Sequence, residues 1–381
     1  MKIGIEAQRV FRKKKHGMDM VVLELIRNLQ QIDTQNQYLV FARPDEDMHA
    51  LQESKNVKIV LLNGGPYPLW EQFSLPAAAR RHGCDILHCT SNTAPVRGKV
   101  PLITTLHDII YMEKHPLLAR GGTLYQKFGN TYRRCIVPAV VRRSRKVITV
   151  SEFEKKRIMS YFGLGPDKLH AVYNGVGDHF RVIHDSGYLQ QMREKYKLPE
   201  RFVFFLGNTD PKKNTPNVLR AVHDFLKTVP EDYRLVMLDY DEDKLVATLR
   251  SVQCEDLRSR IHLTGYVPNA ELPAIINQAH IFLYPSLRES FGIPILEGMA
   301  CGVPVITSNT SSMPEVAGQA ALLVDPSDWK DISAKMKQLN EDKDLYERLR
   351  EKGIERAAVF SWKSMAEHVL ELYKEMYRAN S

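Results

Sequence analysis

Short apolar runs alternate with amphipathic segments along almost the whole chain. In the first half, the apolar runs have the length of strands, and the segments between them repeat apolar residues at the helical period. The expected strands are Ile3–Glu6, Tyr38–Phe41, Val57–Leu61, Ile86–His88, Leu102–Leu106, Val147–Val150 and Ala171–Tyr173. The expected helices are Met18–Gln31, Leu69–Arg81, Thr123–Val140 and Glu152–Tyr161, the last with Ser151 as N-cap and Glu154 completing a capping box.

The alternation stops at a turn-rich stretch, VYNGVGDHF (172–180), and then restarts. Strands are expected at Phe202–Leu206, Leu235–Leu238, Ile261–Thr264, Ile281–Tyr284, Val303–Ile306 and Ala321–Val324. Helices lie between them, and we expect Ser327 to cap a long C-terminal series that runs through Trp362 to Arg378. Alternation of this length is typical of parallel sheets with helices on both faces. The sequence therefore predicts an α/β protein with two doubly wound domains.

Length and composition agree with this division. A chain of 381 residues with 44% hydrophobic content can form two domains, each with its own core. It has no run of ~18 apolar residues, and MKIGIEA enters a strand without the apolar segment of a signal peptide. Five cysteines are an odd set without metal-ligand pairs, although Cys84, His88 and Cys89 leave a metal site as the alternative to buried thiols. We expect reduced thiols and a cytoplasmic location.

Positive charge is concentrated in the first half. The net charge is +8, and residues 1–175 carry 27 Lys+Arg against 15 Asp+Glu. The densest stretch, Lys114–Arg157, contains twelve basic residues and only two acidic ones, and it is interleaved with Tyr125, Phe128, Tyr132 and Phe153. It suits an anionic membrane surface, at ~1 kcal/mol per basic residue near that surface. One alternative is a basic face that is simply solvated. Another is a nucleic-acid-binding surface, but the sequence contains no nucleic-acid-binding motif.

Two carboxylates flank a turn in the stretch Ile281–Ser308. Glu289 lies in the loop after the first strand, and Glu297 is expected in the first turn of the short helix that follows. Pro294 suits the start of that helix and Gly302 its C-terminal cap. Ligands of open parallel sheets bind at the carboxyl ends of strands, so both carboxylates are expected near one crevice. Beside helical N–H groups, they suit a ligand with hydroxyls and a phosphate.

A lysine-containing loop opens the second half. In FFLGNTDPKKNTPNVLRAV, Gly207 ends a strand, residues 211–214 form a turn, and a helix starts at about Thr215. Lys212 or Lys213 could supply charge to a phosphate in this loop. The pattern is neither a P-loop nor a dinucleotide fingerprint, and a solvated loop is the alternative.

The first half offers two weaker signals. KKKHGMDM follows the first strand and opens a helix, and Gly17 would allow the backbone to approach a phosphate closely. His107 ends the strand LITTLHD, where it could orient an acceptor hydroxyl or a developing charge. A structural histidine is the alternative.

Together these motifs resemble the retaining, nucleotide-sugar-dependent glycosyltransferases of family 4, which have the two-domain GT-B fold. The strongest match is PSLRESFGIPILEGMACGVPVITSNTSSMPEV (285–316), which is similar to the E-x7-E region of that family. Further matches are HGM, HD (107–108), VITVSEF, YNGV, LGNTDPKKN, LTGYVPNAEL and FSWKSMAEHVLELY. They recur in family order over nearly the whole chain.

The resemblance implies domains of 1–176 and 177–361, with the last helix (362–381) crossing back to the N-terminal domain. It implies that Glu289 contacts hydroxyls of the donor sugar, that Glu297 takes the ribose hydroxyls, and that Lys213 neutralises the diphosphate. Gly17 would contact the diphosphate from the other domain, and His107 would lie near the donor sugar and acceptor. The other implied donor-binding residues are Gly207, Asn208, Lys212, Gly265, Tyr266, Val267, Arg288, Ser290, Phe291 and Gly292.

The chemistry of sugar transfer agrees with these roles. Cleaving a sugar–phosphate bond leaves negative charge on the diphosphate, and each preorganised donor aimed at it can contribute ~3 kcal/mol. Retention in this family is attributed to attack on the same face, with the leaving phosphate helping to take the acceptor's proton, so Glu289 is expected to position the sugar. The chain departs from many members at Asn208, where they carry Arg; Arg288 could replace that charge.

We therefore expect a metal-independent, cofactor-free retaining hexosyltransferase. The expected donor is a GDP- or UDP-linked sugar, with mannose favoured by LGNTDPKKN and SSMPEV. The expected acceptor is a glycan or lipid-linked glycan in cell-surface polysaccharide or lipopolysaccharide assembly, with peripheral contact to the inner face of an anionic membrane and none to nucleic acid. The alternatives are a GT-B sugar-nucleotide epimerase, a soluble disaccharide synthase, or a degenerate membrane-associated scaffold.

Overall fold

The chain forms two compact units. This computed structural model describes residues 1–15, 17–63, 65–113 and 124–379. Unit 1 comprises Met1–Gly175 and Trp362–Ser381, and unit 2 comprises Val176–Ser361, so the division lies one residue from the predicted one. The final helix, α15 (Trp362–Arg378), belongs to unit 1.

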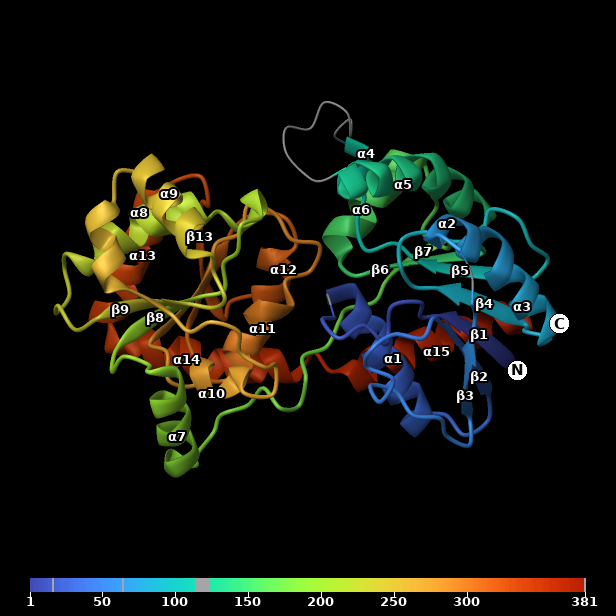
Figure 1. The fold of residues 1–381 in the computed structure, drawn as a ribbon, viewed down its shortest axis with the longest axis horizontal. Helices are drawn as coiled ribbons and strands as arrows, with labels where there is room; N and C mark the ends of the chain where they lie inside the picture. The colour runs from blue at the N-terminus through green and yellow to red at the C-terminus, as the bar shows by residue number, and fades with distance from the viewer. Residues whose placement is uncertain (16, 64, 114–123, 380–381) are drawn as a thin grey trace. The chain divides into compact units, whose positions relative to one another are not determined.

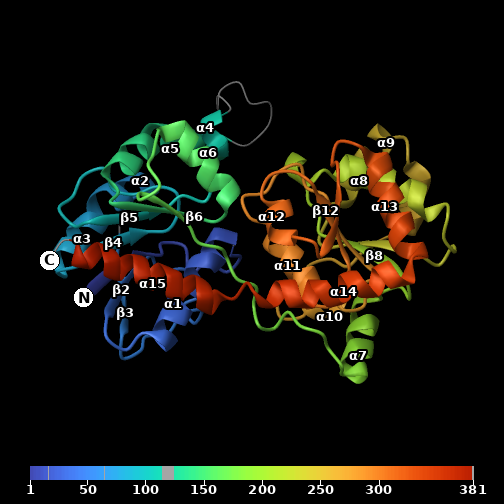
Figure 2. The same cartoon turned by 180° about the vertical axis from the view of Figure 1, so that it is seen from behind.

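Unit 1 contains a seven-stranded parallel sheet in the order β3-β2-β1-β4-β5-β6-β7 (Figure 1). Its strands are β1 (Lys2–Glu6), β2 (Gln37–Ala42), β3 (Val57–Leu61), β4 (Ile86–Cys89), β5 (Leu102–Thr105), β6 (Lys146–Thr149) and β7 (Leu169–Ala171). Its other helical segments are α1 (Gly17–Ile32), α2 (Tyr67–Leu69), the π-helical turn η1 (Trp70–Ser74), α3 (Leu75–Arg81), α4 (Ile110–Glu113), α5 (Leu124–Arg143) and α6 (Glu152–Phe162). Helices α1 and α15 pack side by side on one face of the sheet (Figure 2). The other face is covered by α3, α5 and α6.

Unit 2 repeats this plan with a six-stranded parallel sheet in the order β10-β9-β8-β11-β12-β13. Its strands are β8 (Phe202–Phe205), β9 (Arg234–Met237), β10 (Ile261–Leu263), β11 (Ile281–Tyr284), β12 (Val305–Ser308) and β13 (Ala321–Val324). Its helices are α7 (Ser186–Tyr196), η2 (Pro211–Lys213), α8 (Thr215–Leu226), α9 (Glu242–Ser251), η3 (Glu255–Arg260), α10 (Leu272–Ile276), α11 (Ile293–Ala300), α12 (Met313–Ala317), α13 (Trp329–Glu341) and α14 (Lys343–Ala358). β8 and β11 are fully buried, as central strands of a two-sided parallel sheet should be.

Two predicted elements differ in detail from the structure, and one predicted helix cap was wrong. The segment Leu69–Arg81 contains α2, a π-helical turn and α3, because Pro76 has no N–H to donate to the carbonyl of Gln72 and its ring widens the turn. The strand expected from Val303 begins at Val305 because Gly302 adopts a positive φ of 70° and Pro304 follows. The N-cap of α13 is Asp328, whose side chain accepts from Lys330 N. Ser327 instead donates to Asp325.

Candidate functional site

The order of strands in unit 2 reverses between β8 and β11. In a doubly wound sheet, the loops that leave two such strands diverge and leave a crevice at their carboxyl ends. β8 leads into the lysine-containing loop, and β11 leads into the loop that carries Glu289. The topology therefore brings together two of the segments that the sequence singled out.

The lysine-containing loop is held in one shape by its own polar groups. Asp210 accepts from Lys212 N and caps η2, and Asn214 ends this turn in the left-handed region at φ 62°. The Asn214 amide then donates to the carbonyls of Pro285 (3.1 Å) and Pro326 (2.6 Å), which ties the loop to its neighbours. A Cβ at position 207 would lie 2.1 Å from the buried Phe205 ring, so this position requires glycine.

Lys213, Glu289 and Tyr284 form a compact polar triad. Lys213 Nζ donates to Glu289 Oε1 at 2.7 Å and to the Tyr284 hydroxyl at 2.5 Å. The Tyr284 hydroxyl donates in turn to Glu289 Oε1 at 2.9 Å. An ammonium group has three donors, so one donor of Lys213 is left for a ligand. Burial tends to raise the pKa of Glu289, but Lys213 and Lys212 and these hydrogen bonds hold it below its ordinary value, so the carboxylate is ionised.

The backbone of Glu289 is fixed by the loop that follows β12. Glu289 N donates to Ser311 Oγ at 3.1 Å, and Ser312 Oγ donates to the Glu289 carbonyl at 2.9 Å. Glu289 Oε2 accepts no hydrogen bond from any described residue, although the Glu289 side chain is only 11% exposed. The site thus holds one carboxylate oxygen in place and leaves the other for a hydroxyl.

Glu297 lies near this triad but not in the predicted first turn. It is the fifth residue of α11, because Gly292, at φ 105°, precedes the helix and Pro294 occupies its start. Burial raises the pKa of Glu297 to about 7, against an opposing effect of the Lys213 charge. Its carboxylate has no hydrogen-bond partner in the described part of the chain, so it is available to a ligand with hydroxyls.

The remaining predicted residues of unit 2 lie in loops that follow β8, β10 and β11. Gly265, at φ 71°, follows β10, and the ring of Tyr266 is 62% exposed, next to Val267. Ser290 and Phe291 lie between Glu289 and the helix, Asn208 and Lys212 are exposed in the lysine loop, and Arg288 is half-buried beside Glu289. The replacement of a phosphate-binding arginine by Arg288 stays a prediction.

Two predicted residues belong to unit 1. Gly17 begins α1 and is exposed, and a Cβ added there would meet no atom within 4 Å, so space alone does not require glycine at this position. His107 is 5% exposed and follows β5; its N donates to Asn92 Oδ1 and its Nε2 pairs with the Thr90 carbonyl at 2.9 Å. Burial lowers the pKa of His107, so the imidazole is neutral and donates from Nε2. His16, the first residue of the HGM match, lies outside the described residues.

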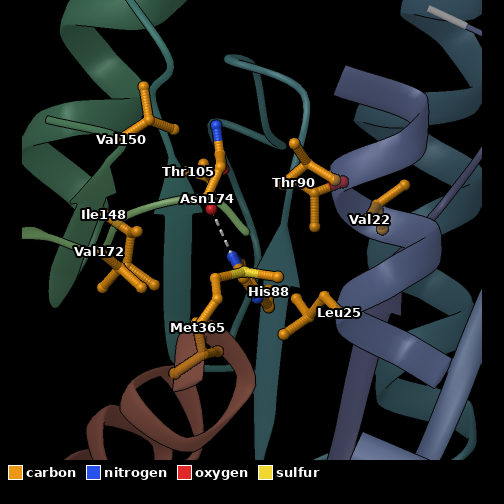
Figure 3. A pocket seen from close by; sticks show the side chains of 12 residues that line it. Val22, Leu25, His88, Thr90, Thr105, Ile148, Val150, Val172, Asn174 and Met365 are labelled. Atoms are coloured by element: carbon orange, nitrogen blue, oxygen red, sulfur yellow. Dashed lines mark hydrogen bonds between the residues drawn. The ribbon is translucent and has the colours of Figure 1, made fainter. Parts of the chain in front are cut away.

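A cavity of about 20 Å³ lies in unit 1 between α1, α15 and the sheet (Figure 3). It is lined largely by aliphatic side chains and has room for about one water molecule, so it is not a substrate site. His88 borders it, with Nδ1 2.6 Å from the Tyr373 hydroxyl and Nε2 2.8 Å from Thr105 Oγ1. Burial lowers the pKa of His88 to about 3, and Cys84 and Cys89 are buried free thiols.

These contacts account for His88 without a metal. No group of three or more His, Cys, Asp or Glu side chains within residues 1–15, 17–63, 65–113 and 124–379 is arranged to hold a metal ion. The metal independence of the reaction itself stays a prediction.

The basic stretch of unit 1 is less available than its sequence indicated, and residues 114–123 lie outside the described part. Arg134 donates to the carbonyls of Tyr111 and Met112, and Arg143 donates to those of Pro95, Gly98 and Val100. Arg142 and Arg145 are exposed. Among the described helices, none is long and apolar enough to cross a membrane.

Sequence reasoning missed Tyr284, Ser311 and Ser312. Tyr284 ends the predicted strand Ile281–Tyr284, and nothing in the pattern shows that its hydroxyl reaches Lys213. The two serines lie within the SSMPEV match, which was the available signal for them.

Family models match both halves of the chain. The model "Glycosyltransferase Family 4" matches residues 16–179, and "Glycosyl transferases group 1" matches residues 190–356. O-antigen chain mannosyltransferase B of Escherichia coli is 30% identical over 278 residues, which are 71% of this chain and 70% of that protein. The chain belongs to glycosyltransferase family 4.

Two further similarities bear on this family member. The serotype-specific mannosyltransferase WbdA of Escherichia coli is 28% identical over 245 residues, 64% of this chain but 30% of WbdA, so the match spans less than a third of that relative. The structure of Anabaena HepE in complex with UDP-glucose superposes with a TM-score of 0.74 at 16% identity, covering 98% of this chain and 100% of HepE. The family 4 chain therefore has the GT-B fold, with two Rossmann-like units.

Proposed function

We propose that this family 4 protein is a retaining glycosyltransferase that moves a hexose from a nucleoside-diphosphate sugar to a glycan or lipid-linked glycan in cell-surface polysaccharide assembly. The observation that carries the proposal is the Lys213–Tyr284–Glu289 triad at the reversal point of the unit 2 sheet. In this triad, the Lys213 ammonium group has one donor left for a ligand, and Glu289 Oε2 has no partner among the described residues.

Each group of the triad matches one part of a sugar nucleotide. The spare donor of Lys213 suits a diphosphate oxygen, whose negative charge grows as the sugar–phosphate bond breaks. Glu289 Oε2 suits a hydroxyl of the transferred hexose, and the unpaired carboxylate of Glu297 suits the ribose diol. The exposed ring of Tyr266 is suited to stacking with the base.

In this mechanism Glu289 holds the sugar and does not attack it. Its Oε1 is already engaged by Lys213 and Tyr284, and the Lys213 charge keeps its pKa low, which makes it a weak base. The proton of the acceptor hydroxyl would pass to an oxygen of the leaving diphosphate, on the same face of the sugar that the leaving group departs from. Lys213 stabilises the resulting charge, and no residue of the triad has to change its protonation state.

We propose GDP-mannose as the donor, since the curated relatives reported above are mannosyltransferases. A screen of GDP-, UDP- and ADP-sugars by thermal shift tests this choice. A donor at 100 times its Kd should stabilise the protein by about 2.7 kcal/mol and raise the Tm by several degrees. The sugar nucleotide that raises the Tm should also serve as donor when a mannoside acceptor is added. If no sugar nucleotide raises the Tm, the transferase proposal is wrong. If the protein converts a sugar nucleotide into another one without any acceptor, it is an epimerase.

We also propose peripheral contact between unit 1 and an anionic membrane surface. Phe73 and Phe128 are 68% and 63% exposed. Their two helical segments are joined nearby, because the Tyr132 hydroxyl accepts from Gln72 and donates to Glu71. Two exposed rings on a basic unit are suited to the headgroup region.

A further inference from the structure

A second polar cluster lies at the reversal point of the unit 1 sheet. The strand order reverses there between β1 and β4, so this is where a doubly wound sheet accommodates a ligand. Glu6 is the last residue of β1, and Thr90 follows β4. Thr90 N and the Gln8 N donate to the two oxygens of Glu6, which is 1% exposed. None of these residues belongs to the donor site described above.

Arg9 is the member of this cluster that has unused hydrogen-bonding groups. It lies in the turn after β1, and its guanidinium carbon is 5.4 Å from the centroid of the Tyr67 ring. Its Nε is buried without a partner, and within the described residues its guanidinium group donates no hydrogen bond. Leaving a buried charged donor unpaired is costly, so an acceptor from outside the chain should occupy this place.

A buried carboxylate holds the ring on which Arg9 lies. Glu71 is fully buried in the π-helical turn and accepts from Tyr67, at 2.5 Å, and from Thr93. Its other oxygen accepts from Gln72 and Tyr132, so all its capacity is used inside the protein. Glu71 is therefore a positioning residue. Single π-helical turns are rare and are often found at functional sites.

The charges around Arg9 favour a neutral ligand over an anion. One guanidinium group faces two buried carboxylates, and Glu6 is near enough for Arg9 to act on its pKa. The pKa of Glu6 is nevertheless raised, chiefly by burial, with Glu71 adding to the effect. A phosphate would add negative charge beside two buried acidic groups that share one guanidinium group, whereas sugar hydroxyls can accept from the arginine without adding charge.

We propose that Arg9, positioned by Tyr67 and Glu71, binds hydroxyl groups of an uncharged hexose at the end of the acceptor glycan. The acceptor role of this site rests on the proposed function, but sugar binding by Arg9 can be tested separately. The site would select a neutral terminal sugar and would not bind the phosphate of a lipid carrier.

The test compares Arg9→Gln and Arg9→Lys with Arg97→Gln, which removes an exposed arginine from the loop after β4. Binding of the methyl α-glycosides of mannose, glucose and galactose to the full chain is measured by saturation-transfer NMR, with mannose 6-phosphate as the anionic probe. At least one neutral glycoside should bind the unaltered chain more tightly than mannose 6-phosphate. Arg9→Gln should raise its Kd about tenfold or more, the range of a hydrogen bond to a charged group, and Arg9→Lys should raise it less. Arg97→Gln should leave it unchanged.

Three results would overturn the inference: no glycoside binding, equal binding by Arg9→Gln, or a preference for mannose 6-phosphate that Arg9→Gln removes. The Tm increase with a sugar nucleotide should be the same in all variants. If no sugar nucleotide raises the Tm of any variant, the proposed function fails, whereas the Arg9 site is still judged by its glycoside binding.

Discussion

Lys213 Nζ lies 2.7 Å from Glu289 Oε1, and the Tyr284 hydroxyl hydrogen-bonds to both. The two charged groups are 76 residues apart in sequence and come from loops after β8 and β11, the strands at the reversal point. An ion pair this well buried is preorganised before any ligand arrives. A diphosphate that approaches Lys213 would therefore meet a cation already fixed in place, with no reorganisation at the moment of reaction.

The first prediction concerns Lys213. Lys213→Ala should lower kcat by about 10²–10³, the usual effect of removing one donor to a developing negative charge. Steady-state transfer from a sugar nucleotide measures this. Lys227→Ala, which removes an exposed lysine at the other end of α8, is the matched control and should retain normal turnover. Near-normal turnover in Lys213→Ala would exclude the assigned role.

A second prediction separates Tyr284 from Glu289. Tyr284→Phe removes the hydroxyl that bridges lysine and carboxylate but keeps the ion pair, so transfer should fall only about tenfold. Glu289→Ala removes both the pair and the sugar contact, and most transfer should be lost. Circular dichroism of both variants checks that they fold. Equal losses in the two variants would contradict the separate sugar contact assigned to Glu289.

The strands and the long helices were predictable because their periodicity is strong. All thirteen predicted strands overlap strands of the structure, and Trp362–Arg378 was located at its observed bounds. Periodicity carries no information on the direction of a hydroxyl, so the contact of Tyr284 with Lys213 was not predictable. Periodicity also does not show that Arg134 and Arg143 donate hydrogen bonds to backbone carbonyls, because those carbonyls are distant in sequence. The cluster around Arg9 was missed for the same reason.

A third prediction concerns metal ions. Lys213 supplies the charge that a metal would otherwise provide to the leaving diphosphate, so EDTA should leave the transfer rate unchanged. The assay is run with and without added Mg²⁺ or Mn²⁺ after chelation. A strong loss with EDTA that either ion restores would contradict metal independence.

A fourth prediction tests the membrane surface with the side chains that the structure shows to be exposed. The double variant Arg142→Gln/Arg145→Gln should reduce binding to vesicles with anionic lipid by about tenfold or more, at ~1 kcal/mol per charge. Phe73→Ser should weaken binding independently of salt, since it removes apolar contact. Arg258→Gln, in unit 2, is the control. Vesicle binding that is absent, or insensitive to salt in the unaltered chain, would exclude this surface.

The last prediction uses the pKa of Glu297, which burial raises from 4.5 to about 7. Ribose hydroxyls should prefer the ionised carboxylate, so the Kd of GDP-mannose should rise up to about tenfold between pH 8 and pH 6. Both phosphates of an intact sugar nucleotide stay ionised over this range and do not contribute. Calorimetric titration of Glu297→Gln should give a weaker Kd without this pH dependence.

The same pKa has the opposite effect on stability. A carboxyl group with a raised pKa binds its proton more tightly in the folded state, so its contribution is fully present below pH 4.5 and is lost as the pH rises through about 7. Between pH 6 and pH 8 the unfolding free energy of the unaltered chain should therefore fall more than that of Glu297→Gln. Denaturant unfolding at both pH values measures the difference. If the two proteins show the same pH dependence in binding and in unfolding, Glu297 does not titrate near neutral pH. An equal Kd for the two proteins at pH 8 would remove Glu297 from the ribose site.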